Sequence, residues 1–402
     1  MNKKNLFFLS LILFFSCSNK DGEGMKYTYS KPSIEIELDT TELIHFNILE
    51  KSITNIFENI DSIRTIPLET TDEALIGQVS MICIVNDTLF VADYHKAKSI
   101  FVFDLQGRYL HKIHHTGEGP GEYKNINMVQ IDSNGITILD WLSWKLIKYD
   151  LSGKLLFEKR IDPNPHDFIE MDNNEMIFGY NTYSAKTPFR IVFTDTALQW
   201  KETAMPQLND RIKGSSGGIS VFQKIINGDI LYNMWLNDTV YHISPDKRII
   251  PKYHLGFHAP GEIASFFEKT KDFNDKDFFR YMTNLIWSFV FFELDDMYFV
   301  SYTKNDIGKS YVSIIQKKDF KISHSIVSDN KNRFVEIPVS IAGHHQNSVL
   351  GWIDDNIIDM LTKKNIDYFF AHLEDKEIRD IKALKGTDKN PTIVFIYFNK
   401  YE

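Results

Sequence analysis

Residues 89–113 read LFVADYHKAKSIFVFDLQGRYLHKI, and a second version of this stretch follows as ITILDW at 136–141 and KLIKYDLSGKLLFEKRI at 145–161. Asp93 and Asp140 lie 47 positions apart, and Gly107 and Gly153 lie 46 apart. A repeat of this length in sequence rich in strand-forming residues is typical of β-propeller blades and other repeated β-architectures. The stretch therefore predicts an all-β fold built by repetition.

Weaker strand signals continue the pattern toward the C-terminus. They read EMIFGY at 175–180, DILYNMW at 229–235, MYFVSY at 297–302 and SVLGWI at 348–353. With the two clear repeats they make six units, and the turns of the first unit divide it into four strands, of which MICIVN at 81–86 is the innermost. We therefore predict a six-bladed β-propeller of four-stranded antiparallel blades.

Three segments depart from the repeat. Clustered aromatic residues at helical spacing predict helical insertions near 261–285 and 362–384. The early segment PSIEIEL at 32–38 has no blade of its own, so we expect it to complete the last sheet and close the ring. Hydrophobic residues make up 43% of the chain, which is enough for residues 32–402 to form one large domain.

The N-terminus has the pattern of a lipoprotein signal peptide over residues 1–16. Lys3 and Lys4 precede the apolar run LFFLSLILFF at 6–15, which is too short to span a bilayer and ends just before Cys17. We expect lipidation at Cys17, with 17–31 as a flexible tether. The acidic residues at 21 and 23 favour an outer-membrane lipoprotein of a Gram-negative envelope, and the sequence leaves open whether it faces the periplasm or the surface.

Charge and cysteine content limit the partners and the chemistry. Removal of residues 1–16 takes away Lys3 and Lys4, so the formal charge changes from −9 to −11, which disfavours nucleic acids and leaves the lipid as the only expected link to the membrane. Besides Cys17 the chain has only Cys83, which lies in an apolar run and is expected to be a buried small hydrophobic residue.

The motifs of residues 66–160 resemble a known family. LFVADYHKAKSIFVFDLQGRYLHKI followed by GEGPGEY at 117–123 resembles the NHL repeat. Together with IPLETTDEALIGQV at 66–79 and the closing DKNPTIVFIYF at 388–398, it resembles six-bladed β-propeller lipoproteins of Gram-negative bacteria. The resemblance implies a fold and a location, and it implies no single activity.

Aromatic residues are the main candidates for binding. Rings recur at the end of the second strand of each unit, where the strand assignment puts them near one loop face, and rings of this kind suit stacking on sugars or peptide side chains. The alternative is packing between blades. The ligand-binding candidates are Tyr94, His95, Trp141, Trp144, Tyr180, Tyr183, Trp235 and Tyr302, with Glu118 and Glu122 of the glycine-rich loop.

Other motifs are assigned structural roles. Asp93 and Asp140 recur at matching strand ends, which favours a repeated task such as accepting backbone hydrogen bonds of a loop. GEGPGEY lacks the lysine and the helix of a phosphate-binding loop. The histidines at 111, 114, 115, 344 and 345 are more simply hydrogen-bonded or exposed than metal ligands, so we predict no metal, no cofactor and no catalytic residue.

We predict that the loop face of the propeller binds an extracellular ligand, such as a glycan or a peptide, or an envelope protein. One alternative is a metal-dependent lyase or hydrolase with ligands converging on the central channel. Another is a structural platform in an envelope complex. The oligomeric state and any reaction stay open at this point.

Overall fold

The computed structural model describes residues 31–37, 43–54, 59–180, 187–207, 221–225, 228–286, 288–304, 309–328, 340–360 and 369–399. The predicted signal peptide and most of the tether, with Tyr183 among the candidate site residues, lie outside the described residues. In what the structure describes, no helix is long and apolar enough to span a bilayer.

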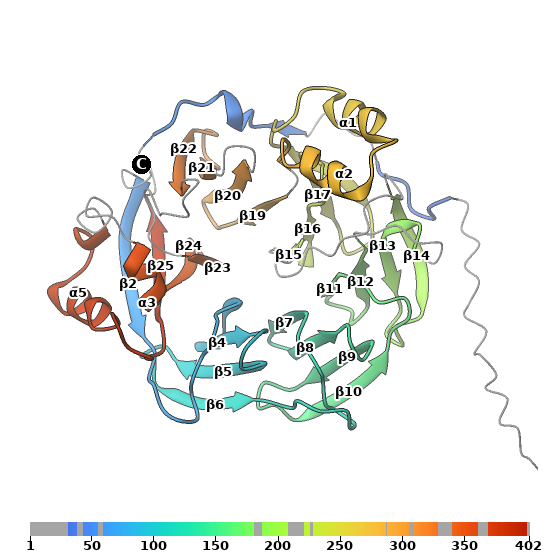
Figure 1. Cartoon of the computed structure of the whole chain (residues 1–402). Coiled ribbons are helices and arrows are strands. Elements are labelled where there is room, and N and C mark those ends of the chain that lie inside the picture. The colour runs from blue at the N-terminus through green and yellow to red at the C-terminus, as the bar shows by residue number, and fades with distance from the viewer. Residues whose placement is uncertain are drawn as a thin grey trace, which may run out of the picture. The chain divides into compact units, whose positions relative to one another are not determined.

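Six sheets stand around a central axis, each with its first strand toward the centre (Figure 1). This confirms the predicted six-bladed propeller. Blade A comprises β3 (Met81–Val85), β4 (Thr88–Asp93), β5 (Ser99–Asp104) and β6 (Tyr109–Ile113). Blade B comprises β7 (Met128–Asp132), β8 (Gly135–Asp140), β9 (Lys145–Tyr149) and β10 (Leu155–Arg160). Blade C comprises β11 (Asp167–Glu170), β12 (Met176–Gly179), β13 (Phe189–Thr194) and β14 (Trp200–Pro206).

The remaining blades follow the same order. Blade D comprises β15 (Phe222–Lys224), β16 (Ile230–Tyr232), β17 (Thr239–Ile243) and β18 (Ile249–His254). Blade E comprises β19 (Phe289–Glu293), β20 (Met297–Lys304), β21 (Lys309–Gln316) and β22 (Ile322–Ser328). Blade F comprises β23 (Ser340–His345), β24 (Ser348–Ile353), β25 (Thr392–Phe398) and, as its outer strand, β2 (Ile60–Pro67).

Local sequence explains the hairpins of blade A. Asn86 and Asp87 adopt φ values of 49° and 55°, the left-handed pair that a tight two-residue hairpin requires. Gly107 has a φ of 82° at the outer turn, and its repeat partner Gly153 has a φ of 90°. A Cβ atom on Gly107 would lie 2.1 Å from the carbonyl oxygen of Pro67, so glycine is required there for both its dihedral and its small size.

The ring is closed by an N-terminal strand, but the segment differs from the predicted one. The closing strand is β2, which pairs antiparallel with β25 from Ile60↔Phe398 to Pro67↔Thr392. The prediction that residues 32–38 complete the last sheet was wrong, because Ile34 instead forms a parallel bridge to Ala204 on the outer edge of blade C. Residues 32–38 and β2 both alternate apolar and polar residues. They differ only in the strand edge with which each of them pairs.

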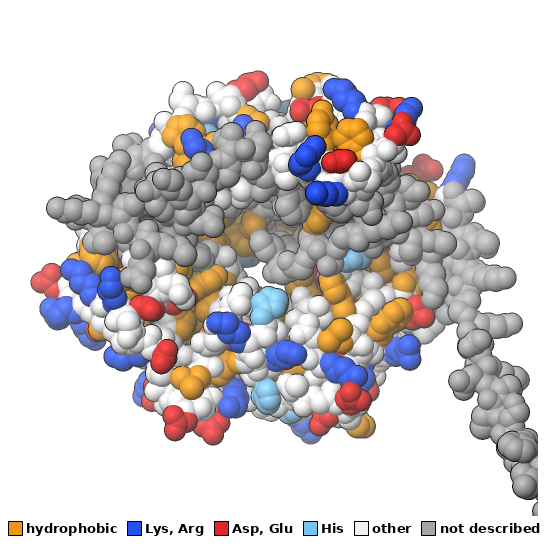
Figure 2. All heavy atoms as spheres, viewed as in Figure 1, with side chains coloured by type: hydrophobic (Ala, Val, Ile, Leu, Met, Phe, Trp, Pro, Cys, Tyr) orange, Lys and Arg blue, Asp and Glu red, His pale blue; other side chains and the backbone are white. Residues whose placement is uncertain are grey.

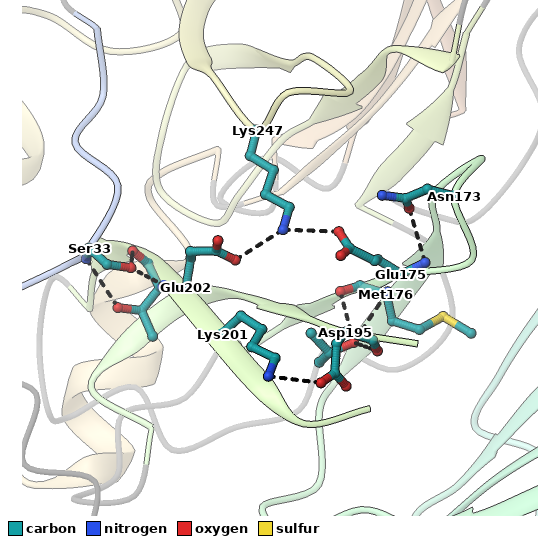
Figure 3. A network of polar contacts seen from close by, with 10 residues as sticks. Ser33, Asn173, Glu175, Met176, Asp195, Lys201, Glu202 and Lys247 are labelled. Carbon is teal, nitrogen blue, oxygen red and sulfur yellow. Dashed lines mark hydrogen bonds and ion pairs between the residues drawn. The ribbon is translucent and has the colours of Figure 1, made fainter. Parts of the chain in front are cut away.

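The chain before β2 runs along the outer edges of three blades, and we call its described residues 31–37 and 43–54 the N-terminal belt. The belt bridges to blade C at Ile34↔Ala204, pairs as β1 (Ile44–His45) with β18 of blade D, and bridges to blade E at Ile53↔His324, always in parallel. A short 3-10 helix occupies Ile48–Glu50. Figure 3 shows Ser33 of the belt, which hydrogen-bonds to Thr203 on β14 of blade C. It also shows Lys247 of blade D between two glutamates, with its ammonium 3.0 Å from Glu202 and 2.9 Å from Glu175.

The core is divided among the interfaces between neighbouring blades. Each of the six interfaces holds its own cluster of buried aliphatic and aromatic side chains, for example Ile136, Ile138 and Ile147 of blade B with Ile100 and Val102 of blade A. Because both faces of most strands are buried in this way, the strands read as continuous apolar runs rather than as strict alternations.

Helices interrupt the repeat at the two predicted places. The segment 261–285 forms two helices, α1 (Glu262–Thr270) and α2 (Asp275–Met282), because Asn274 starts a new helix by accepting a hydrogen bond from the backbone N–H of Asp277. Within the last blade lie α3 (Asp355–Met360) and α5 (Asp375–Lys382), and the start of the predicted 362–384 helix lies outside the described residues. Figure 2 shows hydrophobic side chains between charged ones over α1 and α2.

Candidate functional site

A cavity of about 540 Å³ lies at the centre of the ring and is the candidate functional site. All six innermost strands contribute to its wall, so no single blade defines it. Most of the lining side chains are aliphatic or aromatic, among them Met81, Ile131, Phe168, Phe222, Phe292 and Ile341. The cavity also reaches between blades, where Leu231, Asn233, Ser301 and Ser310 line it.

Two glutamines join neighbouring inner strands across the channel wall. The Gln130 side-chain oxygen accepts a hydrogen bond from the backbone N–H of Glu170 at 2.9 Å. The Gln223 oxygen accepts from the backbone N–H of Glu293 at 2.9 Å, while its amide nitrogen donates to the Glu293 carbonyl at 3.0 Å. Because inner strands of adjacent blades share no ladder, these side chains satisfy backbone groups that would otherwise face the channel.

Burial shifts the pKa values of two other groups in the wall, His344 and Cys83. Burial lowers the pKa of His344 to about 4, so its ring is neutral at pH 7, and its Nε2 atom lies 3.2 Å from the Gln223 amide. Burial likewise raises the pKa of the Cys83 thiol to about 12. The Asp167 carboxylate accepts hydrogen bonds from the backbone N–H groups of Phe168 and Val221. The channel therefore offers a few oriented polar groups on an apolar wall.

The alternative function, a metal-dependent lyase or hydrolase, requires a group of side chains that could bind a metal ion. Within the described ranges, no three His, Cys, Asp or Glu side chains are grouped so that they could hold a metal ion. The neighbouring histidines of blade A each form a hydrogen bond with a different group. His111 bonds with the carbonyl of Leu151, His115 with the carbonyl of Gly153, and His114 with the Ser99 hydroxyl.

The repeated aspartates have the structural role expected for them. Asp93 is fully buried and accepts four backbone hydrogen bonds, two from Gly77 and Gln78 before the blade and two from His95 and Lys96 in the loop after β4. Asp140 repeats the arrangement in blade B, where its carboxylate accepts from the backbone N–H groups of residues 124, 142 and 143. Each carboxylate ties the loop that enters its blade to the loop after the second strand.

The structure places most of the candidate aromatic rings between blades. Tyr180 and Trp141 belong to the cluster between blades B and C, and each donates a hydrogen bond to a backbone carbonyl there. Tyr302 stacks on Tyr311 in blade E. Trp235 packs in one cluster with Phe266 of α1 and Phe278 of α2. Of the candidate aromatic residues that the structure describes, only Tyr94 lines the channel cavity.

The remaining candidates lie in loops near blades A and B. His95 is exposed beside Tyr94. Trp144 is partly exposed, and the Arg160 guanidinium lies 5.9 Å from its ring centre. Glu118 is paired with Lys124 at 2.7 Å, and Glu122 accepts a hydrogen bond from Gly119 within its own loop. The candidates within the described ranges are therefore not brought together into one surface.

Sequence reasoning did not place Gln130, Gln223 and His344 in the channel, although it named His344 as a hydrogen-bonded or exposed histidine. A signal was present, because each lies in the first strand of its unit, and the first strand of a propeller blade lines the axis. Gln130 and Gln223 are amides inside short apolar runs, a pattern that marks a position where a buried side chain must hydrogen-bond.

The fold defines the class of the protein as a six-bladed β-propeller. The chain belongs to the family described as "Domain of unknown function (DUF4934)", whose model matches residues 42–397. Among curated protein sequences, none matches the chain.

Solved structures of other proteins are similar to this chain, and the one from Bacteroides fragilis shows the same fold. A protein of Bacteroides fragilis NCTC 9343 that is named as an exported protein is 17% identical, with 89% of this chain and 100% of that chain covered and a TM-score of 0.72. Virginiamycin B lyase of Staphylococcus aureus is 14% identical, with 72% and 81% covered and a TM-score of 0.41. Hydrazine synthase of Kuenenia stuttgartiensis is 12% identical, with 83% and 87% covered and a TM-score of 0.40.

Proposed function

We propose that this protein is an exported, lipid-anchored propeller that binds a small, largely apolar ligand in its central channel. The cavity of about 540 Å³ is the observation that carries the proposal. Its volume falls within the roughly 300–1,000 Å³ of small-molecule sites, and its apolar wall with a few fixed polar groups has the composition of such sites. Gln130, Gln223 and His344 would orient the hydrogen-bonding groups of the ligand.

The channel supports an apolar ligand better than a glycan. Sugar-binding sites need accessible aromatic rings with polar neighbours, and Tyr94, Tyr180 and Tyr302 are each at most 3% exposed. An apolar ligand gains free energy from the burial of its own surface, and the channel offers the half-buried side chains of Met81, Ile131 and Phe292 for that purpose.

Cys83 allows a direct test, because it lines the channel and is the single cysteine left once Cys17 is replaced. The mature chain with Cys17→Ser is expected to bind the apolar dye Nile red with saturation. Attachment of a bulky maleimide to Cys83 should then block the channel and abolish binding. The labelling is done at alkaline pH, because the raised thiol pKa makes the reactive thiolate scarce at pH 7.

The matched control is the Cys17→Ser/Cys83→Ser double variant, which should keep its dye binding after the same treatment. Binding that survives the labelling of Cys83, in protein whose melting temperature is unchanged, would contradict a site in the channel.

Export and anchoring are supported by Lys3, Lys4 and the apolar run before Cys17. In a Gram-negative host, the wild-type chain should incorporate labelled palmitate and sediment with the membrane fraction. Cys17→Ser should lose both properties, whereas Cys83→Ser should keep both. Membrane association of the Cys17→Ser chain would argue against the lipid anchor.

A further inference from the structure

One end of the channel is crossed by a side-chain contact between two blades that are not neighbours. The amide nitrogen of Gln223, on β15 of blade D, lies 3.2 Å from Nε2 of His344, on β23 of blade F. Blade E stands between these two blades in the ring. The contact therefore narrows the channel near the ends of its inner strands, and His344 lines the cavity there.

The backbone of Glu293 fixes the orientation of the Gln223 amide. The amide oxygen accepts a hydrogen bond from the N–H of Glu293 at 2.9 Å, and the amide nitrogen donates to the carbonyl of the same residue at 3.0 Å. A flipped amide would set donor against donor and acceptor against acceptor. The nitrogen of Gln223 therefore faces His344, with its second hydrogen available for the imidazole.

This orientation decides which nitrogen of the His344 ring carries the proton. Because an amide nitrogen can only donate, Nε2 of His344 has to accept, and in a neutral imidazole the proton then lies on Nδ1. The ring is neutral at pH 7, since burial lowers the pKa of His344 to about 4. Nδ1 of His344 is therefore a hydrogen-bond donor.

The Nδ1 donor is available to a molecule in the cavity. Among the described residues, the only hydrogen bond of the His344 ring is the one to Gln223, and Phe292 packs against the ring with the two centroids 4.7 Å apart. His344 is half-buried and belongs to the cavity wall. An unpaired donor on an apolar wall is unfavourable, so the site favours an occupant that supplies an acceptor.

The charges of the wall indicate that this acceptor is uncharged. Asp132 and Asp167 contribute carboxylates to the lining, whereas the neutral His344 ring offers no positive charge. Lys224 is the single cation among the described lining residues, and its ammonium is paired with Asp172 at 2.7 Å. An anionic ligand would lose its hydration without gaining a counter-charge, while an uncharged carbonyl oxygen costs far less to bury.

On the basis of the channel site proposed above, we propose that its ligand is a neutral apolar molecule with a carbonyl oxygen, which accepts a hydrogen bond from Nδ1–H of His344. His344 is then the residue that selects the ligand. Gln223 is a positioning residue, because it fixes the tautomer of His344. A molecule of the same shape without the oxygen still contacts the apolar wall but leaves the donor unpaired.

Two ligands of nearly the same shape test this selection. They are 2-acetylnaphthalene, a ketone, and 2-isopropenylnaphthalene, in which a CH2 group replaces the oxygen. Each displaces Nile red from the mature Cys17→Ser chain, and the affinity of the dye itself is measured in every variant. The preference for the ketone, expressed as the ratio of the two dissociation constants, should fall about tenfold in His344→Phe, because one hydrogen bond in an apolar site is lost.

His345→Phe is the matched control, because it makes the same substitution at the next residue of β23, which is not among the described lining residues. Successive side chains of a strand point to opposite faces, so this variant should keep the preference of the parent chain. Melting temperatures confirm that all variants fold.

The tautomer has a readout of its own. Nitrogen-15 NMR of the labelled chain should show the proton of His344 on Nδ1, with the signals of this ring identified by their loss in His344→Phe. Gln223→Met removes the amide that donates to Nε2, so the proton should move toward Nε2 and the preference for the ketone should decrease. A purely structural role of Gln223 would leave the tautomer unchanged.

The outcomes separate the choice of ligand from the existence of the channel site. If both naphthalenes displace the dye with the same ratio in the parent chain and in His344→Phe, the role of His344 is refuted and the channel site stands. A proton on Nε2 in the parent chain, or a ketone that fails to displace bound dye, would also refute it. If Nile red itself does not bind with saturation, the channel site is wrong and both proposals fail.

Discussion

Single residues in this propeller act mainly by satisfying backbone groups where blades meet. Asp93 shows this most clearly, because one buried carboxylate accepts four backbone hydrogen bonds from two separate loops. Its recurrence as Asp140 was visible in the sequence and correctly indicated architecture. The loops that it binds come from both sides of the strand, which the sequence did not show.

Asp93→Ala should destabilise the fold by about 3 kcal/mol, because it removes the buried acceptor of four backbone hydrogen bonds that join two loops. Urea unfolding followed by circular dichroism measures this loss. Glu268→Ala, which changes an exposed acidic residue of α1, should stay within about 0.5 kcal/mol of the wild-type chain. An equally small effect for Asp93→Ala would show that water replaces the carboxylate.

Three histidines with lowered pKa values predict how the stability of the fold depends on pH. Burial lowers the pKa values of His166, His324 and His344 from 6.5 to about 4. Between these values the unfolded chain binds more protons than the folded chain, so the free energy of unfolding should fall as the pH decreases from about 6.5 to about 4. Urea midpoints at pH 7 and pH 4.5 test this.

His324→Phe should make that decrease smaller, because it removes one of the three groups. The imidazole of His324 is engaged by the hydroxyls of Ser313 and Tyr302, so the variant should also be less stable than the wild-type chain at pH 7. An unchanged difference between the two pH values would rule out His324 as a contributor.

At the scale of elements, α1 and α2 pack through their own small core. Phe266, Phe278 and Met282 meet Trp235 and Leu236 in a cluster separate from those between blades. The sequence predicted one helical insertion, but the structure has two helices in this segment. The second helix begins after Asn274, whose side chain caps α2. Helical spacing alone could not reveal the break, because aromatic residues lie on both sides of it.

Phe266→Ala should open this insertion while leaving the ring folded. A buried phenylalanine typically contributes about 3–5 kcal/mol, which is comparable to the stability of a two-helix unit. Amide hydrogen exchange of residues 262–282 should therefore accelerate, whereas exchange in β4 and β8 should stay slow. Accelerated exchange throughout the ring would instead mean that the insertion is part of the propeller core.

For the molecule as a whole, closure depends on β2, and the belt reinforces it. β2 supplies the outer strand of blade F and buries Ile63 and Ile66 against the neighbouring blades. The belt lies farther out and joins the outer edges of blades C, D and E. Loss of β2 removes a ladder of seven residue pairs along β25, whereas loss of the belt removes two isolated bridges and the two residue pairs of β1.

Two truncations separate these roles. A chain that starts at residue 58 should fold as a monomer with a lower melting temperature, because it keeps β2 and lacks the belt. A chain that starts at residue 69 should aggregate or stay unfolded, because the free β25 edge pairs with other molecules. Size-exclusion chromatography and thermal melts monitor both. A folded monomer that starts at residue 69 would refute closure by β2.

The sequence by itself determined the repeat, the four-stranded blades and the two helical insertions, because turn residues and hydrophobic patterns are local properties of the chain. Only the tertiary structure decided which N-terminal segment closes the ring, since residues 32–38 and 60–67 carry similar alternation and differ only in the edge that they meet. The tertiary structure also decided that Tyr180 and Tyr302 pack between blades, whereas Gln130 and His344 line the channel. Neighbours in a propeller come from different blades, and no local pattern encodes those contacts.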